Sequence, residues 1–189
     1  LKRQVEQSFA SSLEHLRTEY LDSYILHGPS VYEGLSSSDW EVWKNMEELF
    51  TQGKVKYIGI SNVSYDQITM LYEKSSIKPT FVQNRCFAET KWDKQIRTFC
   101  LEKGILYQGF SLLTANQKFL VDAHPAIDAI IKQTNKNIEQ IIFRFAQQVG
   151  MIPLTGTRSE AHMELDLNIN DLQLSESQME TIENIACLK

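Results

Sequence analysis

Short apolar runs that end in polar side chains recur along this chain of 189 residues. The clearest run covers residues 55–60 and leads directly into Ser61 and Asn62. Apolar runs of four to eight residues, bounded by polar or turn residues, are typical of buried strands. Similar runs cover residues 22–27, 80–85, 106–111 and 151–157. The pattern therefore predicts five strands, and the polar residues at their tips are expected to line one pocket.

The stretches between these runs carry apolar residues at helical spacing. The segments Ser38–Glu41 and Ser64–Gln67 have the pattern of a capping box, which opens a helix. Gly53, Gly104 and Gly150 stand where three of the helices should end. Helices are predicted over residues 2–18, 38–52, 93–103, 125–133, 137–148, 159–166 and 175–187, and from residue 64 onward.

Strands that alternate with helices predict an α/β fold built from parallel strands with helical crossovers. Two architectures fit this alternation, a (β/α) barrel and an open doubly wound sheet. No Gly-x-Gly-x-x-Gly follows any predicted strand, which weakens the case for a dinucleotide-binding open sheet. Polar groups at every strand tip favour the barrel. No linker or low-complexity tract interrupts the chain, so residues 1–189 are expected to form a single domain.

Composition narrows the possible classes of function. A hydrophobic content of 42% and a charged content of 23% are ordinary for a globular protein. The net charge of −5 argues against a nucleic-acid or membrane-surface partner, and no apolar run is long enough to predict a membrane span. Cys86, Cys100 and Cys187 lack metal-ligand spacing and are interpreted as reduced thiols, which predicts a cytoplasmic protein without a metal site.

The first residue is Leu1, and the helical pattern begins immediately with Val5, Phe9 and Leu13. A native chain more often begins outside a secondary-structure element. We therefore expect this sequence to be the C-terminal part of a longer, here truncated, protein.

One block of sequence carries a specific family resemblance. Residues 53–62 read Gly-Lys-Val-Lys-Tyr-Ile-Gly-Ile-Ser-Asn, with residues 22–27 upstream and residues 81–84 downstream. Together with Met-Ile-Pro-Leu-Thr-Gly-Thr at 151–157, this block resembles the aldo/keto reductase family along essentially the whole chain. The resemblance implies a (β/α)8 barrel of the TIM type, of which this chain supplies strands 4 to 8. It also implies NAD(P)H-dependent reduction of aldehydes or ketones to alcohols.

The family's reductases use a tetrad of Asp, Tyr, Lys and His, and only the His is found here. By resemblance it is His27, which would orient the substrate carbonyl and assist protonation of the developing alkoxide. The other three come from strands that this chain does not contain, so residues 1–189 alone are expected to be inactive. Two alternatives stay open: a non-catalytic regulatory or cofactor-binding subunit of the same fold, and a fragment without a function.

The same resemblance assigns residues to the cofactor. Ser61, Asn62 and Gln83 would hydrogen-bond the nicotinamide carboxamide, whose one acceptor and two donors suit such side chains. Phe110 would stack on the nicotinamide ring, with a core role as the alternative. Around the phosphates the resemblance places Ser111, Leu113, Gly156, Thr157 and Arg158.

Departures from the family pattern concern the adenosine end of the cofactor. Residues 154–155 are Leu-Thr where many members have Lys-Ser, and His162 stands at the position of the Arg that binds the 2′-phosphate. Asp166 falls near the adenine, where its charge would repel a 2′-phosphate, and Arg158 could compensate. NADP(H) remains the first expectation, with NAD(H) as the alternative.

The partner implied by the resemblance is a small carbonyl compound. Loops 28–38 and 114–136 could line its pocket, with Val31, Tyr32 and Trp92 as apolar walls. Five strands of a barrel also leave two open edges. We therefore expect self-association, or a second chain that covers these edges.

Overall fold

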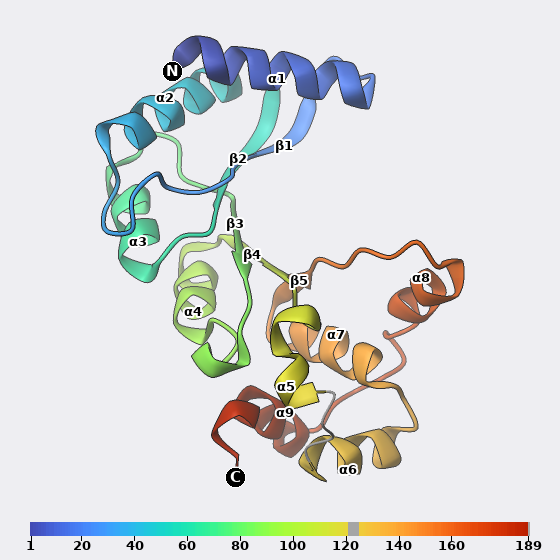
Figure 1. Cartoon of the computed structure of the whole chain (residues 1–189). Coiled ribbons are helices and arrows are strands. Elements are labelled where there is room, and N and C mark those ends of the chain that lie inside the picture. The colour runs from blue at the N-terminus through green and yellow to red at the C-terminus, as the bar shows by residue number, and fades with distance from the viewer. Residues whose placement is uncertain (121–124, 189) are drawn as a thin grey trace. The chain divides into compact units, whose positions relative to one another are not determined.

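A computed structural model of the chain describes residues 1–120 and 125–188. Five parallel strands form one sheet in the order β1-β2-β3-β4-β5, with helices between successive strands, as predicted (Figure 1). The strands are β1 (Leu21–Leu26), β2 (Val55–Ser61), β3 (Phe81–Arg85), β4 (Leu106–Phe110) and β5 (Met151–Pro153).

The predicted helices are present, with boundaries shifted by a few residues. The helices are α1 (Lys2–Leu16), α2 (Ser37–Thr51), α3 (Tyr65–Lys74), α4 (Lys94–Lys103), α5 (Gln117–Leu120), α6 (Pro125–Thr134), α7 (Ile138–Gln148), α8 (Glu160–Leu167) and α9 (Glu176–Glu183). Three 3-10 turns complete the described residues: η1 (Ala88–Thr90), η2 (Thr114–Asn116) and η3 (Ile185–Cys187). The sequence had merged α9 and η3 into one helix. The expected substrate loop 114–136 includes residues 121–124, which lie outside the described residues.

Two sequence predictions about element ends are wrong. The cap of α2 is Ser36 and not Ser38, because Asp39 reaches the backbone N–H three residues before it and completes a capping box with Ser36. The last strand covers only Met151–Pro153 instead of 151–157. The N–H of Leu154 still donates to the carbonyl of Gly109 at 2.8 Å, and the following residues belong to no strand.

The described residues form two compact units, and each is described by itself. The first unit contains residues 1–83 and 102–106. Its core packs the apolar faces of α1, α2 and α3 with β2, and it includes fully buried Trp43, Ile58 and Ile68. Gly59 permits close approach of β2 and β3, since a Cβ there would lie 2.7 Å from the carbonyl oxygen of Phe81.

The second unit contains residues 84–101 and the chain from residue 107 onward. Its core is organised around α7, whose Ile141, Ile142 and Phe145 are fully buried. The ring of Trp92 packs against Phe145 with 5.5 Å between centroids, and its Nε1 donates to the carbonyl of Ile182 at 2.7 Å. Trp92 is 0% exposed, so the prediction that it walls a substrate pocket is wrong: its size and its satisfied N–H make it a core residue.

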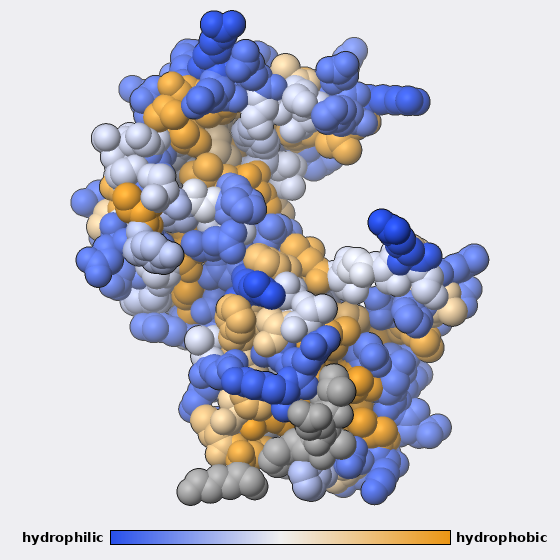
Figure 2. Space-filling model, viewed as in Figure 1, coloured by the Kyte–Doolittle hydropathy of each residue, from blue (hydrophilic) through white to orange (hydrophobic). Residues whose placement is uncertain are grey.

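Polar residues dominate the face shown in Figure 2, with apolar residues reaching the surface in smaller patches. Single exposed apolar side chains are normal for a globular protein. Within the described ranges, no helix combines the length and apolar character needed to cross a membrane.

Candidate functional site

The first unit brings four predicted site residues together at the carboxyl ends of its strands. His27 follows β1, Ser61 ends β2, Asn62 comes next, and Gln83 lies in β3. The side-chain amide of Asn62 donates from Nδ2 to the carbonyl of His27 at 2.7 Å. The hydroxyl of Ser61 donates to the carbonyl of Gln83 at 2.5 Å, and the backbone N–H of Asn62 donates to the same carbonyl at 3.1 Å. These bonds link the three strand tips into one polar cluster.

Local backbone geometry explains why asparagine stands at position 62 and glycine at position 28 beside this cluster. Asn62 has a φ of 53°, in the left-handed region that asparagine tolerates better than most residues. A Cβ on Gly28 would lie 3.4 Å from the Cβ of Asn62, so the chain after β1 passes close to this turn. Because the hydroxyl hydrogen of Ser61 is engaged, its oxygen can only accept from a ligand, and the amide oxygen of Asn62 is an acceptor as well.

The loop that follows His27 is held by two side chains from neighbouring helices. Gln67, buried in α3, donates from Nε2 to the carbonyls of Val31, Tyr32 and Gly34 at 2.9, 3.3 and 3.0 Å. This clamp leaves the Tyr32 side chain fully exposed, so its role as an apolar wall stays a prediction.

Asp39 in α2 holds the same loop from the other side. It accepts hydrogen bonds from the backbone N–H groups of Ser30 and Ser36 at 2.9 and 2.8 Å. Burial disfavours the Asp39 carboxylate, but the bonds from Ser36 and Ser30 outweigh that effect and lower its pKa.

His27 itself is exposed and lines a cavity of about 270 Å³ in the first unit, between α1, α2 and β1. Gln4, Val5, Ser8, Tyr24, Ile25, Leu26, Val42 and Met46 complete the lining. The imidazole of His27 is therefore accessible to a small molecule.

Tyr107 is the most strongly perturbed titratable group in the second unit. Its hydroxyl donates to Oδ2 of Asp93 at 2.7 Å, and the side-chain amide of Asn84 donates to the same oxygen at 3.0 Å. Burial, followed by the neighbouring Cys86 and Asp93, raises the pKa of Tyr107 far above its usual range. Because this hydroxyl is buried and already bonded to Asp93, it is not placed to donate a proton to a ligand.

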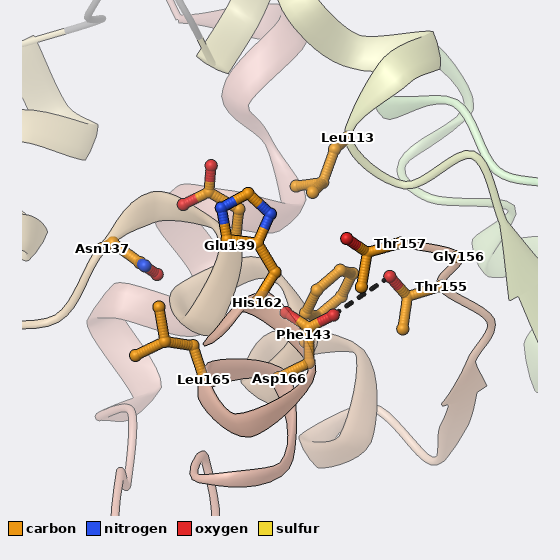
Figure 3. Close-up of a pocket in the computed structure, with 10 residues that line it drawn as sticks. All are labelled: Leu113, Asn137, Glu139, Phe143, Thr155, Gly156, Thr157, His162, Leu165 and Asp166. Carbon is orange, nitrogen blue, oxygen red and sulfur yellow. Dashed lines mark hydrogen bonds between the residues drawn. The ribbon is translucent and has the colours of Figure 1, made fainter. Parts of the chain in front are cut away.

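The second unit holds the adenosine-end candidates around a cavity of about 270 Å³ (Figure 3). Asn137 caps α7 and Ser159 caps α8, and both helices contribute side chains to the cavity. Five of the predicted cofactor residues line it: Leu113, Gly156, Thr157, His162 and Asp166. The segment that follows β5 therefore meets α7 and α8 at one place.

The charges on this cavity are negative. Glu139 extends from the first turn of α7, and Asp166 extends from α8. Oδ2 of Asp166 accepts a hydrogen bond from the hydroxyl of Thr155 at 3.2 Å, which is the dashed line in Figure 3. The described residues that line the cavity include no lysine or arginine.

A second cavity of about 240 Å³ shares part of this lining. Ser111, Leu113 and Gly156 all face it, together with Leu154 and Thr155. Ser111 has a φ of 56°, which marks a sharp change of direction directly after β4. Of the cofactor residues predicted in the second unit, two line neither cavity: Phe110 is half-buried at the end of β4, and Arg158 is exposed.

Sequence reasoning missed several residues of the larger cavity. Glu139 and Phe143 lie one helical turn apart on α7, a helix that the sequence predicted without assigning a site residue to it. The available signal was Asn137, whose capping role places Glu139 in the first turn of α7, where it is half-buried. Thr155 was noted only as a departure from the family pattern.

The described parts of the chain were compared with the requirements of a metal site and of a reactive cysteine. Across residues 1–120 and 125–188, no cluster of three or more His, Cys, Asp or Glu side chains could hold a metal ion. Cys86, Cys100 and Cys187 are free thiols. Burial raises the pKa of both Cys86 and Cys100 to about 12, which keeps these two protonated and unreactive.

Known proteins resemble this chain over nearly its whole length. A model of the Aldo/keto reductase family matches residues 2–186. The uncharacterized oxidoreductase YtbE of Bacillus subtilis is 31% identical over 176 residues, which cover 93% of this chain and 60% of that protein. The NADPH-dependent alpha-keto amide reductase of Saccharomyces cerevisiae is 28% identical, with 92% of this chain and 58% of that protein covered. The chain thus spans about three fifths of the length of these relatives.

A solved structure agrees with the sequence matches. The crystal structure of an aldo/keto reductase from Brucella melitensis superposes with a TM-score of 0.83 at 25% identity, covering 97% of this chain and 68% of that one. The five parallel strands correspond to the C-terminal part of the family's (β/α)8 barrel, as the sequence predicted. The chain belongs to the aldo/keto reductase family.

Proposed function

We propose that this chain is the C-terminal part of an oxidoreductase that uses NAD(P)H to reduce aldehydes or ketones to alcohols. The observation that carries the proposal is the lining of the two cavities in the second unit. Six residues assigned to the cofactor by family resemblance face these cavities: Ser111, Leu113, Gly156, Thr157, His162 and Asp166. Family membership over residues 2–186 and an NADPH-dependent relative support the same function.

The polar cluster of the first unit suits the carboxamide of a nicotinamide. That group presents two N–H donors, and the oxygens of Asn62 and Ser61 are suitable acceptors. Bonds to His27 and Gln83 hold both oxygens in place, so little side-chain freedom is lost on binding. The cofactor, when bound, supplies the hydride.

His27 is proposed to act on the substrate carbonyl. Its exposed imidazole would donate a hydrogen bond to the carbonyl oxygen, orient it, and stabilise the negative charge that develops there. By family resemblance the tetrad's Asp, Tyr and Lys would come from strands outside residues 1–189, and the buried Tyr107, whose hydroxyl is bonded to Asp93, does not suit the task. We therefore propose that residues 1–189 bind the dinucleotide but do not turn over a carbonyl substrate on their own.

Binding and turnover of the purified chain test this proposal. Titration of the chain into NADPH or NADH, followed by nicotinamide fluorescence, should show saturable binding. With a generic aldehyde added, the rate of NADPH or NADH oxidation should equal the rate in buffer without protein. Gly156→Leu should abolish binding, since a side chain there extends into both cavities and a Cβ meets no atom within 4 Å. Ala129→Leu, at an exposed position of α6, is the matched control and should bind normally.

Two outcomes would contradict the proposal. Absence of saturable binding by the folded wild-type chain would remove the cofactor role. Turnover by the chain alone would show that residues other than the tetrad perform the proton transfer. Binding without turnover by a protein that does contain the upstream strands would instead favour the regulatory alternative.

We also propose a cytoplasmic location and association through the sheet edges. Free Cys86, Cys100 and Cys187 suit a reducing compartment, and cell fractionation tests this. β1 and β5 end the strand order among the described residues, and such edges readily pair with other strands. Sedimentation equilibrium of residues 1–189 should show dimers or larger species, and a strictly monomeric chain would contradict the association.

A further inference from the structure

We propose that the cavity between α7, α8 and the segment after β5 accepts an adenosine ribose with a free 2′-hydroxyl, so that this chain binds NAD(H) in preference to NADP(H). The inference rests on the proposed function, because it assigns the adenosine end of the cofactor to this cavity. It departs from the NADPH dependence named for the yeast relative.

Two carboxylates from different elements face the cavity. Glu139 comes from α7 and Asp166 comes from α8, and Figure 3 shows both among the side chains that surround the space with His162. The hydroxyl of Thr155 donates to Oδ2 of Asp166 at 3.2 Å and so holds that carboxylate at the cavity wall. Oδ1 of Asp166 and both oxygens of Glu139 can then accept hydrogen bonds from a ligand.

Positive charge to balance a 2′-phosphate is missing from the described lining. The lining includes no lysine or arginine, and its one basic side chain is the imidazole of His162. Arg158, which the sequence offered as a compensating residue, is exposed and lines neither cavity. Leu154, at the position where many family members have lysine, contributes an apolar wall to the neighbouring cavity.

These two carboxylates distinguish NAD(H) from NADP(H). Ribose hydroxyls donate hydrogen bonds, and a carboxylate near the adenosine ribose is a common acceptor for them in NAD sites. A 2′-phosphate adds close to two negative charges and only acceptor oxygens, so it faces like charge and finds no donor fork. Repulsion of a competing ligand is a usual source of specificity, and here the carboxylates of α7 and α8 would repel the 2′-phosphate of NADP(H).

Equilibrium binding to the purified chain tests the inference without any turnover. The dissociation constants of NADH and NADPH come from nicotinamide fluorescence, and those of 5′-AMP and 2′,5′-ADP from calorimetry. The second pair differs only in the 2′-phosphate, so it isolates the adenosine end. We expect NADH and 5′-AMP to bind at least about tenfold more tightly than their 2′-phosphorylated counterparts.

The double variant Glu139→Gln with Asp166→Asn removes both charges and keeps the shapes and the acceptor oxygen for Thr155. It should improve the affinity for NADPH by about tenfold or more and change that for NADH far less. Glu164→Gln is the matched control, since Glu164 is an exposed acid on the same helix outside the lining. Its ratio of NADH to NADPH affinity should equal that of the wild type.

The outcomes separate this inference from the proposed function. Tighter binding of NADPH by the wild type, or an unchanged ratio in the double variant, would overturn the inference and leave the proposed function standing. Failure to bind any of the four nucleotides would overturn the proposed function, and the inference with it.

Discussion

Two buried glutamines perform the same local task in the two units but support their surroundings differently. Gln67 in α3 and Gln140 in α7 each complete a capping box at the third position of a helix. Gln67 also donates from Nε2 to the carbonyls of Val31 and Gly34 at 2.9 and 3.0 Å. Gln140 reaches the carbonyls of Leu165 and Asn168 only at 3.4 Å each, near the limit for a hydrogen bond.

The difference shows how firmly the polar cluster of the first unit and the helix α8 of the second unit are held. The loop after His27 is fixed by short bonds, and the side chains of Ser61 and Asn62 are fixed by the backbone of neighbouring strands. The helix α8, which carries His162 and Asp166, has no buried residue. Segments with few buried contacts open most easily. The loop after His27 is therefore held more firmly than α8, and under the proposed function we expect α8 to adjust more readily when a ligand binds.

The largest expected effect comes from removing the tighter of the two glutamines. Gln67→Ala leaves three loop carbonyls without this donor and should lower the free energy of unfolding by about 3 kcal/mol. Gln140→Ala removes two long bonds and should cost about 1 kcal/mol, mainly through the lost cap. Urea denaturation of both variants measures the difference. Equal losses would show that the two units are held equally well.

Two glycines offer a second contrast between the units. Gly59→Ala places a Cβ 2.7 Å from the carbonyl oxygen of Phe81 and should destabilise the chain by about 2 kcal/mol, as overpacking does. Gly156→Ala meets no atom within 4 Å and should leave the midpoint of denaturation within error of the wild type. A stability loss at Gly156 as large as that at Gly59 would mean that the cavity is not open.

The smallest expected effect concerns the turn at Asn62. Asn62→Ala loses the bond to the carbonyl of His27 and strains a left-handed backbone, so it should cost about 1 kcal/mol. Asn62→Gly loses the same bond but tolerates the positive φ, and should recover part of that stability. Both variants should weaken NADH binding alike, because both lack the amide oxygen. If Asn62→Gly bound NADH as the wild type does, the amide would have no part in binding.

The sequence was sufficient for the five parallel strands, their alternation with helices and the family. These features depend on local periodicity and on a nearly continuous motif at residues 53–62, so tertiary context adds little to them. The clustering of His27, Ser61 and Asn62 was also predictable, because the carboxyl ends of parallel strands lie at one edge of a sheet. Their partners are backbone carbonyls, which no side-chain pattern reveals.

Residues that depend on packing between distant segments could not be predicted. Trp92 stands in a polar stretch after β3, yet it is buried against Phe145 more than fifty positions away. Glu139 resembles an ordinary acidic residue in the first turn of a helix until the segment after β5 places a cavity beside it. The cap of α2 was predicted at Ser38, and only the reach of Asp39 places it at Ser36.

Titration of the isotope-labelled chain with NADH, followed through its backbone amide resonances, tests the central claim most directly. We predict saturable shifts at Ser61 and Asn62, for the carboxamide, and at Thr157 and Asp166, for the adenosine, all with one dissociation constant. Titration with 5′-AMP should shift only the second pair. Shifts absent from either pair at saturating NADH would contradict the assignment of this chain as the cofactor-binding part of a reductase.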